Sequence, residues 1–310
     1  MLPVGDKTPQ GWELPRTEPS ERIKRLIRKL VYPAYLKLIN PVLQKRFDPE
    51  NRLDADQWFW GHRGLEYGLL RKNLDRIADI RGKHILIAGC GTGRDIPSWM
   101  DYRPKQVVGV DYFSYDRAWA ALCSQYSSAA TLGFVQGDLG DFREMPSASF
   151  DLIGSDAVFE HLKNLPEVLE EFYRLLKDDG VIYATFGPLW YSWGGDHVSG
   201  YDEIRNGYNH VILSPENYQR YLDAYGEFSH SEDDGRTWVE HDLFSYLRPA
   251  EYLSALEAAG FKKMYLGVVI DPRAVRCLQE HPNIGQLLPN GDKLDWLVTG
   301  MTVVYRKLPA

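Results

Sequence analysis

Apolar and polar positions divide the chain into an N-terminal segment with one helical stripe and a longer region of alternating strands and helices. From residue 84 onward, short runs rich in β-branched residues are separated by longer amphipathic stretches. Such alternation is typical of a parallel sheet whose crossover connections are helices. The predicted strands are residues 84–88, 106–110, 132–136, 150–154, 180–186, 261–270 and 296–306. The predicted helices are residues 94–100, 114–127, 166–176 and 249–259.

The N-terminal segment predicts an amphipathic helix after a proline-rich lead-in. Ser20 can cap the helix, and Pro33 and Pro41 interrupt its continuation. Basic residues lie between the apolar positions of the stripe, which follow i, i+3, i+4 spacing. These apolar positions are Ile23, Leu26, Ile27, Leu30 and Val31.

Composition narrows the class of protein without indicating a function. The 310 residues are 44% hydrophobic and 25% charged, which is typical of a soluble globular protein and excludes a disordered or fibrous chain. No stretch reaches the ~20 apolar residues of a membrane span, and the N-terminus lacks the pattern of a secretory signal. Three widely spaced cysteines do not make a disulfide framework. We therefore expect a cytoplasmic protein.

The net charge of -7 conceals two segments of opposite sign. Residues 16–46 carry nine Lys/Arg and two Glu, a balance of +7. Residues 188–247 carry three Arg and eleven Asp/Glu, a balance of -8, and also contain twelve aromatic residues and four of the eight histidines. Such asymmetry indicates that the charges of these two segments, rather than the net charge of the whole chain, are relevant to the choice of binding partners.

A glycine-rich turn follows the first predicted strand and opens the next helix. Gly89, Gly91 and Gly93 allow the backbone to pass close to a ligand there. A dinucleotide fingerprint has glycines at its first, third and sixth positions, but the sixth position here is Arg94, which disfavours NAD and FAD. Asp111 ends the second strand, where a carboxylate can accept both ribose hydroxyls of an adenosine.

Two further strands end in residues with candidate roles. The third runs into Asp138 and Leu139, where a carboxylate could accept an adenine amino group. The fourth runs into Ser155 and then Glu160-His161. All of these positions fall at the carboxyl edge of the predicted sheet, where open α/β sheets bind ligands.

At these motifs the chain resembles the class I S-adenosylmethionine-dependent methyltransferases, particularly the small-molecule group. The resemblance covers residues 80–187 closely and residues 248–310 more loosely, through residues 256–261. It implies an α/β, Rossmann-like doubly wound sheet of seven strands with the last antiparallel, a helical N-terminal arm, an inserted cap and S-adenosyl-L-methionine as cofactor. The cofactor-binding residues that it implies are Gly89, Cys90, Gly91, Gly93, Asp111, Tyr112, Asp138, Leu139 and Ser155.

The roles implied by the resemblance differ along the cofactor. The glycine-rich turn would line its methionine and ribose side, Asp111 would hold the ribose hydroxyls and Tyr112 would cover the adenine. Asp138 and Leu139 would frame the adenine edge, and Ser155 would lie near the sulfonium. Cys90 is interpreted as a small packing residue rather than a redox group.

The same pattern divides the chain into four parts. Residues 1–60 form an N-terminal extension with the basic helix, and residues 61–187 form the cofactor-binding core. Residues 188–247 form an aromatic, acidic substrate cap, and residues 248–310 complete the core sheet.

Methyl transfer is an in-line displacement that often needs a base to remove a proton. The candidate bases are His161 after the fourth strand and His197 and His210 in the cap. The alternative for the Glu160-His161 pair is that it positions a loop or caps the next helix. The histidine and carboxylate spacing in the cap does not match a metal motif, so no metal site is predicted.

Aromatic residues of the cap are candidates for a wall that excludes water from the substrate. The alternative, which stays open, is that they form the small core of the cap itself. The candidates are Trp190, Tyr191, Trp193, Tyr201 and Tyr208.

The sequence favours O-methylation of a small molecule, either a specialised metabolite or a sugar-containing compound. The fourth strand lacks the Asn/Asp-Pro-Pro-Tyr signature of many amino- and nucleobase-methylating enzymes. The alternatives are N- or C-methylation on the same fold, a nicotinamide-dependent oxidoreductase and a non-catalytic partner protein.

The basic arm has three interpretations. It packs on the core with its charges in water, it closes over the cofactor, or it contacts an anionic membrane surface through residues 20–46. Residues that would close over the cofactor with it are Trp58, Trp60, Arg63 and Tyr67. The arm is also a candidate dimerisation element. Nucleic-acid binding is not expected, because the chain is acidic and contains no recognisable module.

Overall fold

The computed structural model describes residues 67–128, 131–200, 202–225 and 235–309. The predicted N-terminal helix, the boundary of the extension at residue 60, and Trp58, Trp60, Arg63 and Tyr201 lie outside these residues.

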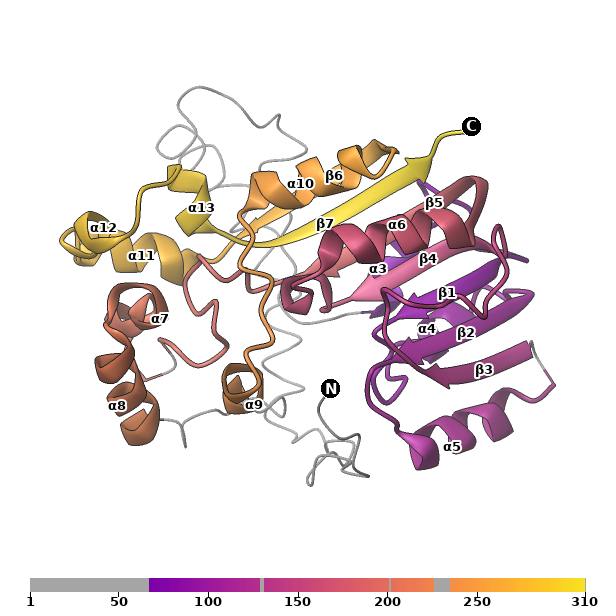
Figure 1. The fold of residues 1–310 in the computed structure, drawn as a ribbon, viewed down its shortest axis with the longest axis horizontal. Coiled ribbons are helices and arrows are strands. Elements are labelled where there is room, and N and C mark those ends of the chain that lie inside the picture. Colours follow the sequence, from indigo (N-terminus) through magenta and orange to yellow (C-terminus); the bar gives the residue numbers. More distant parts are fainter. Residues whose placement is uncertain (1–66, 129–130, 201, 226–234, 310) are drawn as a thin grey trace.

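A seven-stranded sheet in the order β3-β2-β1-β4-β5-β7-β6 organises the described chain (Figure 1). Its strands are β1 (His84–Ala88), β2 (Gln106–Asp111), β3 (Thr131–Gln136), β4 (Phe150–Asp156), β5 (Leu176–Phe186), β6 (Phe261–Ile270) and β7 (Val298–Lys307). The first five strands pair in parallel, whereas β7 is antiparallel to both β5 and β6. The predicted seven-stranded sheet with an antiparallel last strand is confirmed.

Both faces of the sheet are buried, because side chains that alternate along the strands pack against helices on either side. On one face Leu86 and Ile153 pack with residues of α6 (Leu165–Leu175) and α10 (Pro249–Ala258), which lie across the near side of the sheet in Figure 1. On the other face Ile85 and Leu152 pack with α3 (Tyr67–Leu74), α4 (Ile96–Met100) and α5 (Asp116–Tyr126). This two-sided burial explains why the strands are continuous apolar runs.

The strand order reverses direction between β1 and β4. The chain proceeds from β1 outward to β2 and β3, and then returns to place β4 on the other side of β1. In open α/β sheets, the crevice beyond the carboxyl ends of the strands at such a switch point is where ligands bind. The predicted site residues that follow β1, β2 and β4 therefore meet at one edge.

The cap that follows β5 is built from two separate stretches of chain. The first contains η2 (Ile204–Asn206), α7 (Asn209–Ile212), α8 (Pro215–Tyr225) and α9 (Gly235–Glu240). The second connects β6 to β7 and contains α11 (Pro272–Glu280), α12 (Ile284–Leu287) and α13 (Lys293–Leu297). Trp193 and Tyr208 of the first stretch share one hydrophobic cluster with Val275 and Trp296 of the second. Helices α11 and α13 therefore pack against the predicted cap, residues 188–247, and we include them when we refer to the cap.

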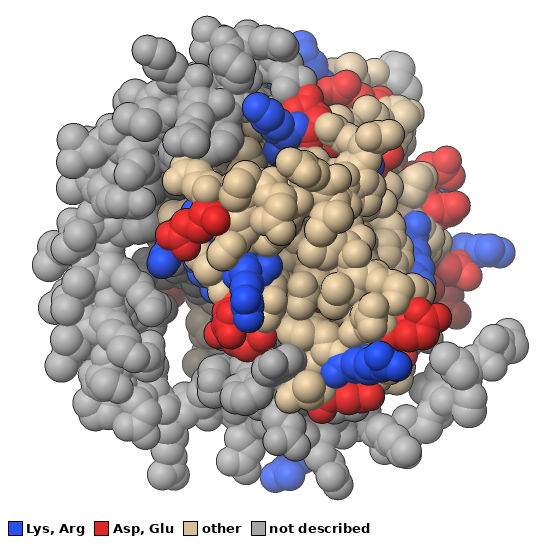
Figure 2. Space-filling view, turned by 90° about the vertical axis from the view of Figure 1, so that its left-hand side faces the viewer, with Lys and Arg blue, Asp and Glu red and all other residues tan. Residues whose placement is uncertain are grey.

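The cap end of the molecule has a largely uncharged face. In Figure 2, uncharged residues occupy the middle of this face, and Lys, Arg, Asp and Glu lie mainly around it. Leu287 of α12 is among the most exposed large hydrophobic side chains of the described chain, at 60%.

Candidate active site

The three glycines of the turn after β1 have different structural roles. All three have positive φ, at +70° for Gly89, +49° for Gly91 and +81° for Gly93. A Cβ on Gly89 would lie 2.2 Å from Val158 Cγ2, and one on Gly93 would lie 2.4 Å from Leu122 Cδ1. A Cβ on Gly91 would meet nothing within 4 Å. The outer glycines therefore permit packing of the turn, whereas Gly91 faces open space in which a ligand can approach.

Asp111 at the end of β2 lies directly against this turn. Its Oδ2 accepts a hydrogen bond from the Gly91 backbone N–H at 2.7 Å, and its Oδ1 accepts one from the Phe113 N–H at 3.0 Å. Burial raises the pKa of this carboxyl, and the backbone donors oppose that rise. The next residue, Tyr112, is 61% exposed and free of the core.

The remaining predicted cofactor residues lie at the same edge but make mostly local contacts. Asp138 accepts a hydrogen bond from the Gly140 N–H, and Leu139 is buried in the hydrophobic core. Ser155 Oγ donates to the Ala88 carbonyl at 3.1 Å and so joins β4 to β1. Cys90 is buried, and burial raises the pKa of its thiol far above the ordinary value.

A buried charge cluster, which the sequence analysis missed, lies beside the turn. Arg71 of α3 is fully buried and forms an ion pair with Asp156 at the end of β4. Its Nη2 lies 3.5 Å from Asp95 Oδ2, and its guanidinium lies 3.7 Å from the centre of the Trp99 ring. Trp99 Nε1 also donates to Asp95, and Tyr183 Oη donates to Asp156 at 3.1 Å. We name Arg71, Asp95 and Asp156 the buried charge cluster.

The buried charge cluster is incompletely satisfied within the described chain. Arg71 Nε and Nη1 are buried and have no hydrogen-bond partner there. Burial raises the pKa of Asp95 to about 6, and the negative charge of Asp156 adds to the rise while Arg71 opposes it. Two carboxylates thus face one guanidinium that has free N–H groups. The half-buried Tyr67, at the start of α3, also lies within electrostatic reach of this cluster.

Positions in the sequence offered part of the signal for this cluster. Asp95 lies two residues after Gly93, and Asp156 directly follows Ser155 at the end of β4, so both are acidic residues at the ligand-binding edge. Arg71 carried no such signal, because its pairing depends on how α3 packs against the sheet.

His161 is at the end of a short 3-10 turn after β4 and is held by the cap. Its Nδ1 lies 2.7 Å from the Leu243 carbonyl oxygen. Its ring stacks on Trp238 with centroids 4.3 Å apart, and the His197 ring lies 5.1 Å away. Burial lowers the pKa of His161 to about 4, so the ring is neutral at neutral pH. A carbonyl can only accept, so Nδ1 carries the proton and Nε2 retains a lone pair.

The two cap histidines have different surroundings. His197 Nε2 is buried without a hydrogen-bond partner among the described residues, and burial lowers the pKa of the ring to about 3. His210 Nε2 donates to the Trp190 carbonyl at 2.7 Å, and its Nδ1 lies 3.6 Å from the buried Asp196 carboxylate. The structure therefore brings His161 and His197 together, whereas His210 supports the backbone of Trp190.

The predicted aromatic wall separates into two groups. The Trp190 ring packs against Phe244 and Tyr246 at centroid distances of 4.7 and 4.6 Å. Phe244 in turn lies 5.9 Å from His161. No sequence pattern indicated Trp238 or Phe244, because their proximity to His161 comes from the return of the chain to the core.

The other three candidates lie toward α11 and α13. Trp193 and Tyr208 are buried, with Trp193 Nε1 donating to the Ile204 carbonyl and Tyr208 Oη donating to the Trp296 carbonyl. Tyr191 packs edge-on against Trp296. These residues pack in the hydrophobic cluster that the first stretch shares with α11 and α13, as expected if they form a core of the cap. Their contribution to a substrate wall stays a prediction, and Tyr201 lies outside the described residues.

Residues 86–184 match the protein family described as "Methyltransferase domain". The match runs from β1 to β5 and includes the glycine-rich turn, Asp111 and His161. This part of the chain is a class I S-adenosylmethionine-dependent methyltransferase domain. The predicted family and its cofactor, S-adenosyl-L-methionine, are confirmed by this match.

Curated relatives are identical to this chain at somewhat more than a quarter of the aligned positions. The chain is 28% identical over 148 residues to a malonyl-[acyl-carrier protein] O-methyltransferase of Bacillus cereus, covering 47% of this chain and 53% of that protein. It is 28% identical over 138 residues to a ubiquinone biosynthesis O-methyltransferase of Neisseria meningitidis, covering 42% and 57%. The chain thus spans a little over half the length of these two relatives.

A solved structure of an S-adenosylmethionine-dependent methyltransferase from Mesorhizobium loti is also similar. It is 15% identical, covers 77% of this chain and 98% of that one, and has a TM-score of 0.47.

Within the described residues, no group of three or more His, Cys, Asp or Glu side chains is placed to bind a metal ion. None of the helices in this part of the chain combines the length and apolar character needed to cross a bilayer.

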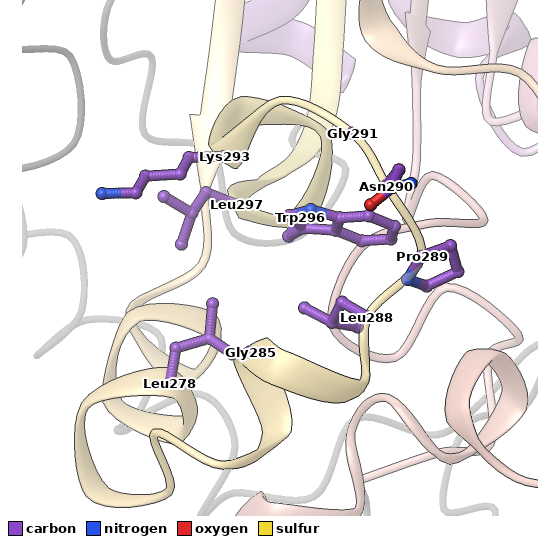
Figure 3. Close-up of a pocket in the computed structure, with 9 residues that line it drawn as sticks. All are labelled: Leu278, Gly285, Leu288, Pro289, Asn290, Gly291, Lys293, Trp296 and Leu297. Carbon is purple, nitrogen blue, oxygen red and sulfur yellow. The ribbon is translucent and has the colours of Figure 1, made fainter.

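A pocket of about 370 Å³ lies outside the methyltransferase domain, among α11, α12 and α13 (Figure 3). Leu288, Trp296 and Leu297 line it, and Lys293 extends away from Trp296. None of the predicted site residues borders this pocket. It belongs to the cap rather than to the carboxyl edge of the sheet.

Proposed function

We propose that this protein transfers a methyl group from S-adenosyl-L-methionine to a hydroxyl group of a small molecule, with His161 as the general base. The observation that carries the proposal is the hydrogen bond from His161 Nδ1 to the Leu243 carbonyl, which leaves Nε2 unprotonated. A base of this kind is useful for an alcohol or phenol, whose proton must leave as the oxygen attacks.

We infer that residues around the glycine-rich turn hold the ribose and the amino-acid end of the cofactor. Asp111 offers carboxylate oxygens to the ribose hydroxyls, and the open space at Gly91 lets the cofactor lie against the backbone. The amino-acid end of the cofactor carries both an ammonium and a carboxylate. The surplus carboxylate of the buried charge cluster suits the ammonium, and the unpartnered N–H groups of Arg71 suit the carboxylate.

The residues of the chain then have distinct chemical tasks. When bound, the cofactor supplies an electrophilic methyl group on a positively charged sulfur. His161 Nε2 would accept the hydroxyl proton as the substrate oxygen takes the methyl group, while the carbon–sulfur bond breaks and sulfur would leave as a neutral thioether with the bonding pair. Trp238 stacks on the His161 ring, Phe244 lies beside it, and Trp190 packs on Phe244. We assign to these three rings the task of excluding water from the base.

Oxygen as the acceptor atom has support from two directions. Two relatives are named as O-methyltransferases, and β4 lacks the Asn/Asp-Pro-Pro-Tyr signature noted above. We propose a specialised metabolite or a sugar-containing compound as the substrate. A cytoplasmic location, contact of residues 20–46 with a membrane surface and a homodimer are further proposals that come from the sequence.

The test supplies cofactor with a deuterated methyl group and the purified protein to an extract of the host. We expect a mass-shifted product whose label is on oxygen. Label on nitrogen or carbon would overturn the proposed O-methylation, and absence of any labelled product would overturn the proposed activity.

Once the methylated product is identified, the role of His161 can be tested by mutation. His161→Gln keeps a donor for the Leu243 carbonyl but removes the base, so we expect kcat to fall by about 10²–10⁴-fold with cofactor affinity unchanged. His241→Gln, at an exposed position of the cap, is the matched control. Because the pKa of His161 is about 4, its protonation should lower the rate only in acid, near that pH. An unchanged rate in His161→Gln would contradict its role as the base.

A further inference from the structure

The short segment after β4 holds both ends of the first stretch of the cap, which connects β5 to α10. Glu160 Oε1 accepts a hydrogen bond from the Gly187 N–H at 2.9 Å, where the chain enters the cap. The Glu160 backbone carbonyl accepts one from the Ser245 N–H at 2.8 Å, where the chain leaves it. His161 contacts the same returning stretch through Leu243. Two consecutive residues of the core thus hold the beginning and the end of the first stretch of the cap.

Glu160 is placed for this task rather than for direct chemistry. It is 1% exposed, and its backbone and side chain contact segments that are far apart in the sequence. Ser245 is tied further to the core by a hydrogen bond to Tyr252 of α10. Leu243, two residues earlier, is therefore constrained from the core side through Ser245, and from the cap side by the hydrogen bond that its N–H donates to the Trp238 carbonyl at 2.9 Å.

The position of Leu243 has a chemical consequence at His161. A neutral imidazole carries its proton on one nitrogen, and a hydrogen bond to a carbonyl fixes which one. With the Leu243 carbonyl 2.7 Å away, the proton stays on Nδ1 and Nε2 is basic. If the returning stretch moved away, the proton could occupy Nε2, and that nitrogen could no longer accept one.

We propose that docking of residues 243–245 onto the core sets the tautomer of His161, and that Glu160 is the positioning residue that keeps them docked. The base is then competent only when the cap is closed over the site. This inference rests on the proposed function in one respect, since His161 is the base of that reaction. It assigns to the cap a role in activating the enzyme as well as in enclosing the substrate.

The test is nitrogen NMR of the full chain labelled at histidine, at neutral pH, together with amide hydrogen exchange. In the wild-type protein we expect His161 to show a protonated Nδ1 and an unprotonated Nε2. Glu160→Ala should convert this signal to an average of the two tautomers and raise exchange at the Ser245 N–H by about tenfold or more. Glu160→Gln retains an oxygen acceptor for Gly187 and should restore the wild-type signal.

Controls separate this effect from general loss of structure. Glu170→Ala, at an exposed position of α6, should leave both readouts unchanged. Cofactor affinity in Glu160→Ala should stay within twofold of wild type, because Glu160 contacts neither Asp111 nor Arg71 in the hydrogen bonds above. If Glu160→Ala does not fold, Glu160→Asp withdraws the carboxylate from Gly187 by one methylene and should shift the tautomer in the same direction.

The outcome is distinguishable from failure of the proposed function, because neither readout needs a methyl acceptor. An unchanged His161 tautomer in a folded Glu160→Ala or Glu160→Asp protein overturns this inference, even if methyl transfer is found. A shifted tautomer supports the inference, whether or not methyl transfer is found.

Discussion

The Asp111 carboxylate accepts a 2.7 Å hydrogen bond from the backbone N–H of Gly91, twenty residues earlier in the chain. This contact joins the end of β2 to the glycine-rich turn after β1. The turn is therefore held in shape by the same side chain that we propose binds the ribose. Binding of the cofactor would then require little rearrangement of the turn.

Replacement of Asp111 tests this relationship directly. Asp111→Ala removes a carboxylate that can form two charge-assisted hydrogen bonds, each of about 1.5–3 kcal/mol. We expect the Kd for S-adenosyl-L-methionine, measured by calorimetry, to rise at least about a hundredfold. Asp101→Ala, at an exposed position after α4, should bind normally. Retention of wild-type affinity by Asp111→Ala would rule out this cofactor site.

Gly91 offers a second test, with an unusually close control. Gly91 and Gly82 both have positive φ, at +49° and +66°, and a Cβ on either would meet nothing within 4 Å. Alanine at each position should therefore cost a similar ~1–2 kcal/mol of backbone strain, measured by chemical denaturation. Only Gly91→Ala should also weaken cofactor binding, because its methyl group enters the proposed ligand space. Equal affinity in the two variants would show that the cofactor does not pass Gly91.

Arg71 is expected to contribute to both stability and cofactor binding. Arg71→Met leaves Asp156 and Asp95 buried without their cation, and removing one partner of a buried pair typically costs about 3–5 kcal/mol. Urea denaturation should show a loss of that order, and calorimetry on the folded fraction should show weaker cofactor binding. Arg276→Met, which breaks the exposed pair with Glu280, is the control and should change neither quantity measurably. A stable Arg71→Met protein would argue against the buried ion pair.

Glu160 should give the protein a characteristic dependence of stability on pH. Burial raises the pKa of Glu160 from 4.5 to about 7, so the folded state keeps its proton over a range in which the unfolded chain has lost it. The contribution of this group to stability is therefore highest below pH ~4.5 and falls by roughly 3 kcal/mol as the pH rises to ~7.

The variant Glu160→Gln isolates that contribution. Its stability relative to wild type should increase between pH ~4.5 and ~7, because the amide does not ionise. The stability of Glu160→Gln has to be compared with that of wild type at each pH. The lowered pKa values of His161 and His197 make both proteins more stable as the pH rises through the same range, which is the opposite of the effect of Glu160. Glu170→Gln, at an exposed position, should follow the wild-type curve. Parallel curves for Glu160→Gln and wild type would contradict the raised pKa.

Local patterns in the sequence were sufficient to predict much of the core. The bounds of β1 and β6 agree with the predicted strands, and the other five strands differ from their predictions mainly at the ends. The one larger difference is β5, which begins at Leu176, where the sequence predicted the last residue of a helix. These elements can be predicted from sequence because apolar runs, glycines and strand-end carboxylates reflect the conformation of only a few neighbouring residues. The positive φ of the glycine-rich turn is likewise a local property of that turn.

Tertiary structure alone decided the contacts on which the proposed chemistry depends. Arg71 and Asp156 are 85 residues apart, and His161 and Leu243 are 82 residues apart. The helices α11–α13 join the cap because their apolar sides meet Trp193 and Tyr208, and no periodicity within them identifies that partner. The sequence by itself determined the sheet, the glycine-rich turn and the carboxylate at its edge, which depend on neighbouring residues. Which buried charges pair, which nitrogen of His161 is basic and which segments form the cap depend on distant segments packing together, and packing is a property of the folded chain.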